Sequence, residues 1–101
     1  FINSNNKSIN IEFIQNLVAS HFNLNIQELL SPRRSRSLAR PRQIAMYLAK
    51  HHTTNSLPDI GRKFSNRDHT TVIHAVKKIS ELLKKDDDIR ESVTVLKKKL
   101  L

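Results

Sequence analysis

Glycine and proline are scarce in this chain, and that scarcity constrains the fold more than any other feature. The 101 residues include one Gly and three Pro, too few turn-forming residues for a many-stranded sandwich or barrel. Helices joined by short loops need fewer of them. At 11.7 kDa the chain is also about the size of one domain. We therefore predict a small all-α domain.

The charge of the chain is strongly positive and unevenly distributed. Lys and Arg number 18 against nine Asp and Glu, which gives a net charge of +9 and a pI near 10.4. Residues 29–58 contain six basic residues and no acidic one, whereas residues 1–28 are close to neutral. This balance favours a polyanionic partner. Nucleic acid is the leading candidate, and an anionic membrane surface is the alternative.

Several classes of function are disfavoured by what the sequence lacks. The chain has no Cys, so it has no disulfide, thiolate metal site or cysteine nucleophile, which fits a reducing compartment. Its neighbouring histidines, His51 with His52 and His69 with His74, do not have the i, i+4 spacing of two metal ligands on one helix face. No Gly-rich phosphate loop, Ser-His-Asp arrangement or pair of carboxylates is indicated. We expect no catalytic residue, no metal and no cofactor in this chain.

Apolar residues recur every three or four positions in six segments, as amphipathic helices require. Asn10 precedes the first segment, and Asn25 with Glu28 has the spacing of a capping box before the short second one. Ser56 precedes the fourth segment and Asp68 a long fifth one. These patterns predict a bundle of about six helices.

The third and sixth helices have boundary residues of other kinds. The third is expected to have Pro41 in its first turn, where a missing N–H breaks no hydrogen bond. Its outer side is expected to carry Arg42, Met46 and Lys50. The last helix is expected to be capped by Asp88, with Glu91 completing a capping box.

The fourth and fifth helices, with the short connection between them, have the order of a helix-turn-helix. In that motif the second helix enters the major groove of DNA by its N-terminal end. The residues at this end can hydrogen-bond to base edges, and they are Arg67, Asp68, His69, Thr70 and Thr71. The alternative interpretation is that Asp68 only caps the helix and the threonines are ordinary surface residues.

A basic loop lies between the second and third helices and contains Arg33, Arg34 and Arg36. Such a loop beside a helix-turn-helix can enter the minor groove, as homeodomain arms do. It can equally be a solvated loop. Three functions therefore stay open from the residues alone: sequence-specific DNA binding, nonspecific binding of nucleic acid by charge, and docking to proteins or anionic lipid through an amphipathic helix.

Two segments resemble a known family. The string IGRKFSNRDHTTVIHA at residues 60–75 is similar to the signature of the DnaA family of bacterial replication initiators, and RRSRSLARPRQIAM at residues 33–46 resembles that family's basic loop and following helix. The resemblance covers about residues 8–100. It implies a Trp-repressor-like helix-turn-helix domain over residues 8–101, preceded by a linker remnant at residues 1–7.

The resemblance also implies a function and the residues that perform it. The expected partner is double-stranded DNA, bound at nine-base-pair boxes resembling TTATNCACA in a replication origin. Arg34 is expected in the minor groove, although Pro32 departs from the family pattern and leaves Arg36 as the alternative. The expected base-reading residues of the major groove are Asp68, His69 and Thr70, with Arg67 beside them. The expected contacts to the DNA backbone are Arg42, Gln43, Lys50, Leu57, Pro58, Thr71 and His74.

The family's other properties are expected outside this chain. An ATP-binding module that uses Mg²⁺ and drives self-assembly would lie upstream, and none of its motifs is present here. Acidic phospholipid is a possible partner near the N-terminal end of the chain. The implied location is the bacterial cytoplasm, in association with the nucleoid.

Overall fold

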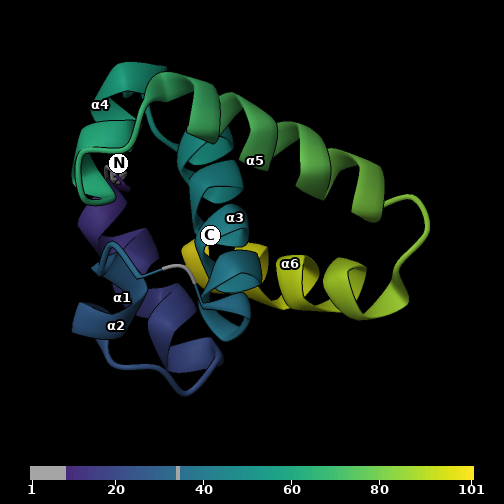
Figure 1. Ribbon diagram of the computed structural model, residues 1–101. Helices are drawn as coiled ribbons and strands as arrows, with labels where there is room; N and C mark the ends of the chain where they lie inside the picture. Colours follow the sequence, from purple (N-terminus) through teal and green to yellow (C-terminus); the bar gives the residue numbers. More distant parts are fainter. Residues whose placement is uncertain (1–8, 34) are drawn as a thin grey trace, which may run out of the picture.

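The computed structural model describes residues 9–33 and 35–101 and contains only helices within them (Figure 1). The predicted all-α bundle of six helices is confirmed. In chain order the helices are α1 (Ile11–His21), α2 (Ile26–Leu30), α3 (Arg36–His52), α4 (Leu57–Lys63), α5 (His69–Leu82) and α6 (Asp87–Leu100).

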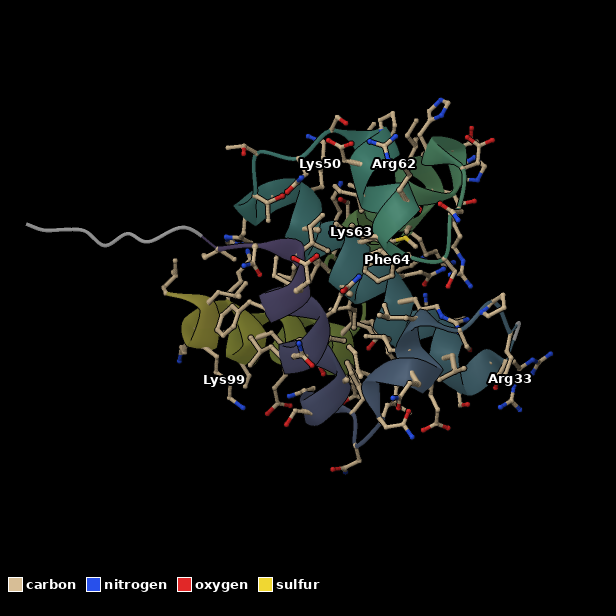
Figure 2. The ribbon with its side chains drawn as sticks, turned by 90° about the vertical axis from the view of Figure 1, so that its left-hand side faces the viewer. Arg33, Lys50, Arg62, Lys63, Phe64 and Lys99 are labelled. Atoms are coloured by element: carbon tan, nitrogen blue, oxygen red, sulfur yellow. The ribbon has the colours of Figure 1, made fainter. Side chains whose placement is uncertain are left out.

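Helix α3 is the centre of the fold, since it packs against α1, α2, α4 and α5. Its buried residues include Ile44, Ala45 and Leu48, none of which is accessible to solvent. Figure 1 shows α5 crossing one end of α3, while α6 returns from the turn at the far end of α5. Phe64, which follows α4, is also fully buried and lies well inside the molecule in Figure 2, whereas Arg33 and Lys99 lie at its edges. The core thus holds α4 and α5 firmly against α3.

The predicted N-terminal caps are confirmed at four helices. The side chains of Asn10, Asn25 and Ser56 each accept a hydrogen bond from the backbone N–H three residues on, and Glu28 completes the capping box with Asn25. The carboxylate of Asp68 accepts from the N–H of Thr70. These local bonds fix where the helices begin.

Two predicted helix starts are wrong. Helix α3 begins at Arg36 instead of near Pro41, which lies inside the helix. The apolar Leu38, 3% exposed, gives the turn before the proline a place in the core, which offsets the one hydrogen bond that Pro41 cannot make. Helix α6 is capped by Asp86 and not Asp88, because the side chain of Asp86 accepts from the N–H of Ile89 at 3.2 Å.

Candidate nucleic-acid interface

The turn between α4 and α5 is tight and rests on one glycine. Ser65 and Asn66 both have left-handed backbone conformations, with φ of 63° and 55°. The chain then folds back so that the N–H of Arg67 donates to the carbonyl oxygen of Gly61 at 2.8 Å. A Cβ at position 61 would lie 2.1 Å from the carbonyl oxygen of Arg67. Only glycine fits this approach, which sets the position of α5 relative to α4.

The N-terminal end of α5 presents its polar side chains to solvent. Asp68, His69, Thr70 and Thr71 are all exposed, and the carboxylate of Asp68 lies 2.9 Å from Nδ1 of His69. Both the hydrogen-bonding groups and the positive end of the helix dipole are therefore directed away from the core. The capping role of Asp68 leaves its side chain at the surface, so the two interpretations of this residue are compatible.

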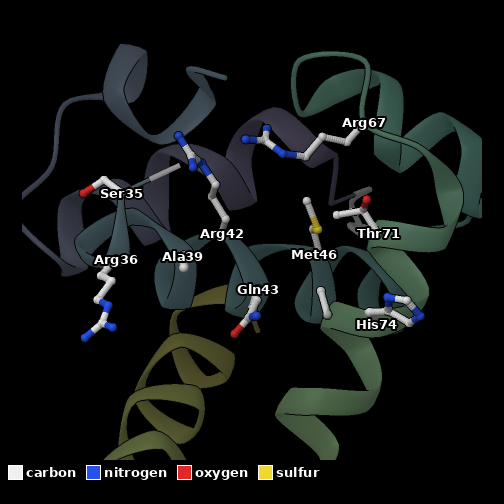
Figure 3. Close-up of a pocket in the computed structure, with 10 residues that line it drawn as sticks. Ser35, Arg36, Ala39, Arg42, Gln43, Met46, Arg67, Thr71 and His74 are labelled. Carbon is white, nitrogen blue, oxygen red and sulfur yellow. The ribbon is translucent and has the colours of Figure 1, made fainter. Parts of the chain in front are cut away.

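A groove of about 370 Å³ runs between α3 and α5 and gathers residues from both helices (Figure 3). Five residues that the sequence assigned to the site line it from two distant segments, namely Arg42, Gln43, Arg67, Thr71 and His74. Arg36, an exposed candidate for the minor groove, lies at one end of the groove. Arg34 lies outside the described residues.

Three predicted contacts to the DNA backbone lie away from the groove. Lys50 is exposed near the end of α3, and Leu57 and Pro58 form the first two positions of α4. None of the three is among the residues that line the groove. Figure 2 shows Lys50 toward the same end of the molecule as Arg62, on the side where α4 lies. The predicted site is thus divided between the groove and the start of α4.

The predicted position of Arg42 on the outer side of its helix is wrong, and so is that of Met46. Arg42 is 6% exposed and Met46 is 2% exposed. The guanidinium of Arg42 donates to main-chain carbonyl oxygens of the segment before α3. Arg42 also lines the groove, and its contact with phosphate stays a prediction. The spacing from Leu38 to Arg42, Ala45 and Ala49 follows one helix face and could have indicated this burial.

Arg67 is also engaged within the protein. Its guanidinium donates to the carbonyl oxygens of Phe64 at 2.7 Å and Ser31 at 3.2 Å. Figure 3 shows Arg42 and Arg67 extending toward one another over the groove. Burial, and secondarily the charge of Arg67, lowers the pKa of Arg42. Arg67 therefore contacts the basic loop, and contact with a base stays a prediction.

Sequence reasoning missed two polar residues that support the site. Nε2 of the buried Gln15 donates to the carbonyl oxygen of Lys63 at 2.9 Å and holds α1 against the end of α4. The hydroxyl of Ser65 donates to the carbonyl oxygen of Leu30, at the end of α2. A buried glutamine among apolar residues of one helix face is a signal for the first contact, but no local pattern indicates the second.

We expect two histidines near the end of α3 to make the stability of the domain depend on pH. Burial lowers the pKa of both His51 and His52 below the usual 6.5. The charges of Lys50 and Lys97 lower the pKa of His51 further, and the charges of Lys97 and His51 lower that of His52. The rings of Tyr47 and His51 pack together, with their centroids 4.4 Å apart. Folding thus favours the neutral imidazoles, so their contribution is complete above pH 6.5 and is lost as the pH falls through the folded pKa values.

We expect the melting temperature to fall between about pH 7.5 and about pH 5.5, across the histidine range. In a His51→Gln, His52→Gln variant the fall should be smaller, because glutamine does not titrate. Thermal unfolding followed by circular dichroism at both pH values measures the difference. An equal fall in the two proteins would assign the pH dependence to other groups.

The described residues show neither a metal centre nor a membrane span. No group of three or more His, Cys, Asp or Glu side chains in this part of the chain could hold a metal ion. No helix among the residues described is both long enough and apolar enough to cross a bilayer.

A short helix, a tight turn and a second helix with an exposed polar N-terminal end define a helix-turn-helix protein. A model of a protein family described as "Bacterial dnaA protein helix-turn-helix" matches residues 11–79 of this chain. The chain belongs to this family, the bacterial DnaA proteins.

Individual relatives agree with this assignment. The chain is 54% identical over 97 residues to the chromosomal replication initiator protein DnaA of Wolbachia pipientis wMel and 50% identical over 97 residues to that of Rickettsia bellii. Each match covers 96% of this chain and 21% of the relative, so the chain spans about a fifth of their length. A crystal structure titled as a DNA replication initiation factor superposes with a TM-score of 0.78 at 33% identity, covering 89% of this chain and 27% of that one.

Proposed function

We propose that this chain binds double-stranded DNA in a sequence-specific manner at nine-base-pair boxes resembling TTATNCACA. The observation that carries the proposal is the end of α5, where Asp68, His69 and Thr70 are exposed together beyond a turn that fixes their position. Carboxylate, imidazole and hydroxyl groups are of the kinds that read base edges in the major groove. Membership of the DnaA family supports the same function.

The contacts divide into those that position the protein and those that read sequence. Gln43, Thr71 and His74 in the groove, with Lys50 and the start of α4, contact phosphates and contribute most of the affinity. The end of α5 reads the major groove, and one arginine of the basic loop, Arg34 or Arg36, reads the minor groove. Narrow A·T-rich minor grooves attract arginine by their negative potential.

The test is fluorescence anisotropy with a labelled duplex that contains TTATCCACA and with a scrambled duplex of the same composition, at several salt concentrations. We expect at least tenfold tighter binding to the box, about 1.4 kcal/mol, and expect the preference to persist at high salt. Equal and steeply salt-dependent binding of both duplexes would leave only a nonspecific basic module.

Asp68→Asn separates base reading from helix capping. Asparagine caps a helix about as well as aspartate, so the melting temperature should stay nearly unchanged. The amide replaces one acceptor oxygen with a donor, and binding to the box should weaken by about 1 to 3 kcal/mol while binding to the scrambled duplex stays the same. Anisotropy with both duplexes measures this, and equal losses on the two would contradict a base-reading role.

Lys50→Ala tests a phosphate contact. Removal of one such contact should weaken binding to both duplexes and reduce the slope of log K against log salt by about one unit. Lys99→Ala is the charge-matched control, because Lys99 is exposed near the end of α6 and well apart from Lys50 (Figure 2). If the two variants change the slope equally, Lys50 acts only through net charge.

Within a longer initiator, this binding would place the protein at a bacterial replication origin for the start of chromosome replication. The ATP-dependent assembly expected of the upstream part would then act on DNA already held by this domain. Chain length supports this arrangement, since the relatives are about five times as long as the matched segment.

A further inference from the structure

Arg42 uses its guanidinium to bind the main chain that leads into the basic loop. Nε donates to the carbonyl oxygen of Leu29 at 2.7 Å, and Nη1 donates to that of Arg33 at 2.5 Å. Nη2 lies within hydrogen-bond distance of three further acceptors, the carbonyl oxygens of Glu28 at 3.1 Å and Ser31 at 2.6 Å and the hydroxyl of Ser31 at 3.0 Å. One side chain therefore spans the segment from residue 28 to residue 33.

The surroundings explain why a charged group is stable in this position. Glu28 and Leu29 belong to the last turn of α2, where carbonyl oxygens lack the usual partner four residues on. The carbonyl oxygen of Glu28 accepts from the N–H and the hydroxyl of Ser31 as well as from Arg42. These carbonyls also form the negative end of the helix dipole, which favours a cation. The planar guanidinium has donors in several directions and can bind several carbonyl oxygens at once, whereas a lysine ammonium is a compact point charge on a flexible stem.

The turn of the helix-turn-helix holds the same segment from the other side. Arg67 donates to the carbonyl oxygen of Ser31, which Arg42 also binds, and the hydroxyl of Ser65 donates to that of Leu30. The carbonyl oxygens of three consecutive residues, Leu29, Leu30 and Ser31, are thus bound by side chains of α3 or of the α4–α5 turn. The same turn carries Asp68 and the start of α5, so the loop and the helix end share one framework.

We propose that Arg42 and Arg67 are positioning residues that hold the basic loop at a fixed distance from the end of α5, so that minor-groove and major-groove reading occur in register on one box. The inference rests on the proposed function and adds a physical link between its two reading elements. In this role Arg42 acts through the loop backbone. A loop released from these contacts would keep its charge but lose its defined approach to the minor groove.

The test compares two kinds of modified box. Replacing adenine by 2,6-diaminopurine adds an amino group to the minor-groove edge and leaves adenine's major-groove edge intact, while replacing thymine by uracil removes only the methyl group in the major groove. For the wild-type domain we expect some positions to lose about tenfold in affinity with diaminopurine, and others to lose affinity with uracil.

In Arg42→Lys the diaminopurine penalty should fall to about twofold or less, while the uracil penalty stays as in the wild type. Arg67→Lys should act in the same direction, because its guanidinium also donates to the carbonyl oxygen of Ser31. Arg90→Lys is the matched control. Arg90 of α6 also donates to a carbonyl oxygen at a helix C-terminus, that of Leu83 after α5, at 3.0 Å. Retention of both penalties in Arg42→Lys would overturn the proposal, and so would loss of both together.

Hydrogen exchange without DNA separates this proposal from the function on which it rests. Amides of residues 28–31 and of Arg33 should exchange at least tenfold faster in Arg42→Lys than in the wild type, with no change in α6. Unchanged exchange in this segment would overturn the positioning role whatever the DNA results. If the wild-type domain shows no preference for the box, the proposed function fails, and the exchange result alone decides whether Arg42 holds the loop.

Discussion

Gly61→Ala is expected to cost the domain about 3 kcal/mol of folding free energy, at the upper end of the usual range for overpacking. The added Cβ would lie 2.1 Å from the carbonyl oxygen of Arg67, and this atom is main chain, which cannot rotate aside as a side chain can. Relief requires the turn to move away from α4, which breaks the bond from the N–H of Arg67 to Gly61. Urea unfolding followed by circular dichroism measures the loss.

The same substitution should also abolish the preference for the box over a scrambled duplex, because the turn sets the direction of α5. Arg62→Ala is the control, since it changes the next residue of the same helix, which is exposed and pairs with Asp59 at the surface. Exposed pairs contribute little, so its effect should stay below about 1 kcal/mol. A Gly61→Ala protein as stable as Arg62→Ala would show that the turn relaxes at little cost.

Phe64→Ala is expected to destabilise the domain by about 3 to 5 kcal/mol, as for other buried aromatic residues. Phe64 is fully buried and is among the largest such side chains in the described chain. Its removal leaves a cavity among helices that cannot collapse without displacing α4. Since a domain of this size is stable by about 5 to 15 kcal/mol, much of the protein should be unfolded at moderate urea concentrations.

Phe13→Ala provides the matched comparison, because Phe13 is 47% exposed on α1. The same atoms are removed, but from a position where water already contacts the ring, so the change should be within about 0.5 kcal/mol. Chemical denaturation of both variants and the wild type distinguishes cavity formation from a general effect of losing an aromatic residue. Similar losses in the two variants would contradict the position of Phe64 at the core.

Helices could be predicted from this sequence where the determining interactions are local. The caps at Asn25 and Asp68 depend on residues two or three positions away, and both were predicted correctly. Pro41 was placed wrongly because its effect on the helix depends on a tertiary contact, the burial of Leu38 in the preceding turn. Asp86 was missed because three consecutive aspartates can each cap a helix, and the packing of Ile89 selects among them.

Several residues that the sequence named for the site lie together in one groove, while their roles in DNA binding stay predictions. Family resemblance named Gln43 and His74, but only the packing of α3 against α5 brings them into one groove. Arg42 was placed on the outer side of its helix, opposite the apolar stripe, and an isolated basic residue is usually exposed. Its guanidinium instead binds main-chain carbonyl oxygens. Those of Glu28, Leu29 and Ser31 are more than ten residues away from Arg42 in the sequence, so no local pattern indicates them.

The central position of α3 has a consequence for engineering altered sequence preference. Gln43 on this helix is bordered by buried neighbours, so a randomised library at α3 would lose many members to unfolding before selection for binding begins. The outward strip of α5 is different, because Thr70, Ile73 and Lys77 are all exposed. Variation confined to that strip would leave the core intact, so if α5 reads the box as proposed, its sequence preference could change there without loss of the fold.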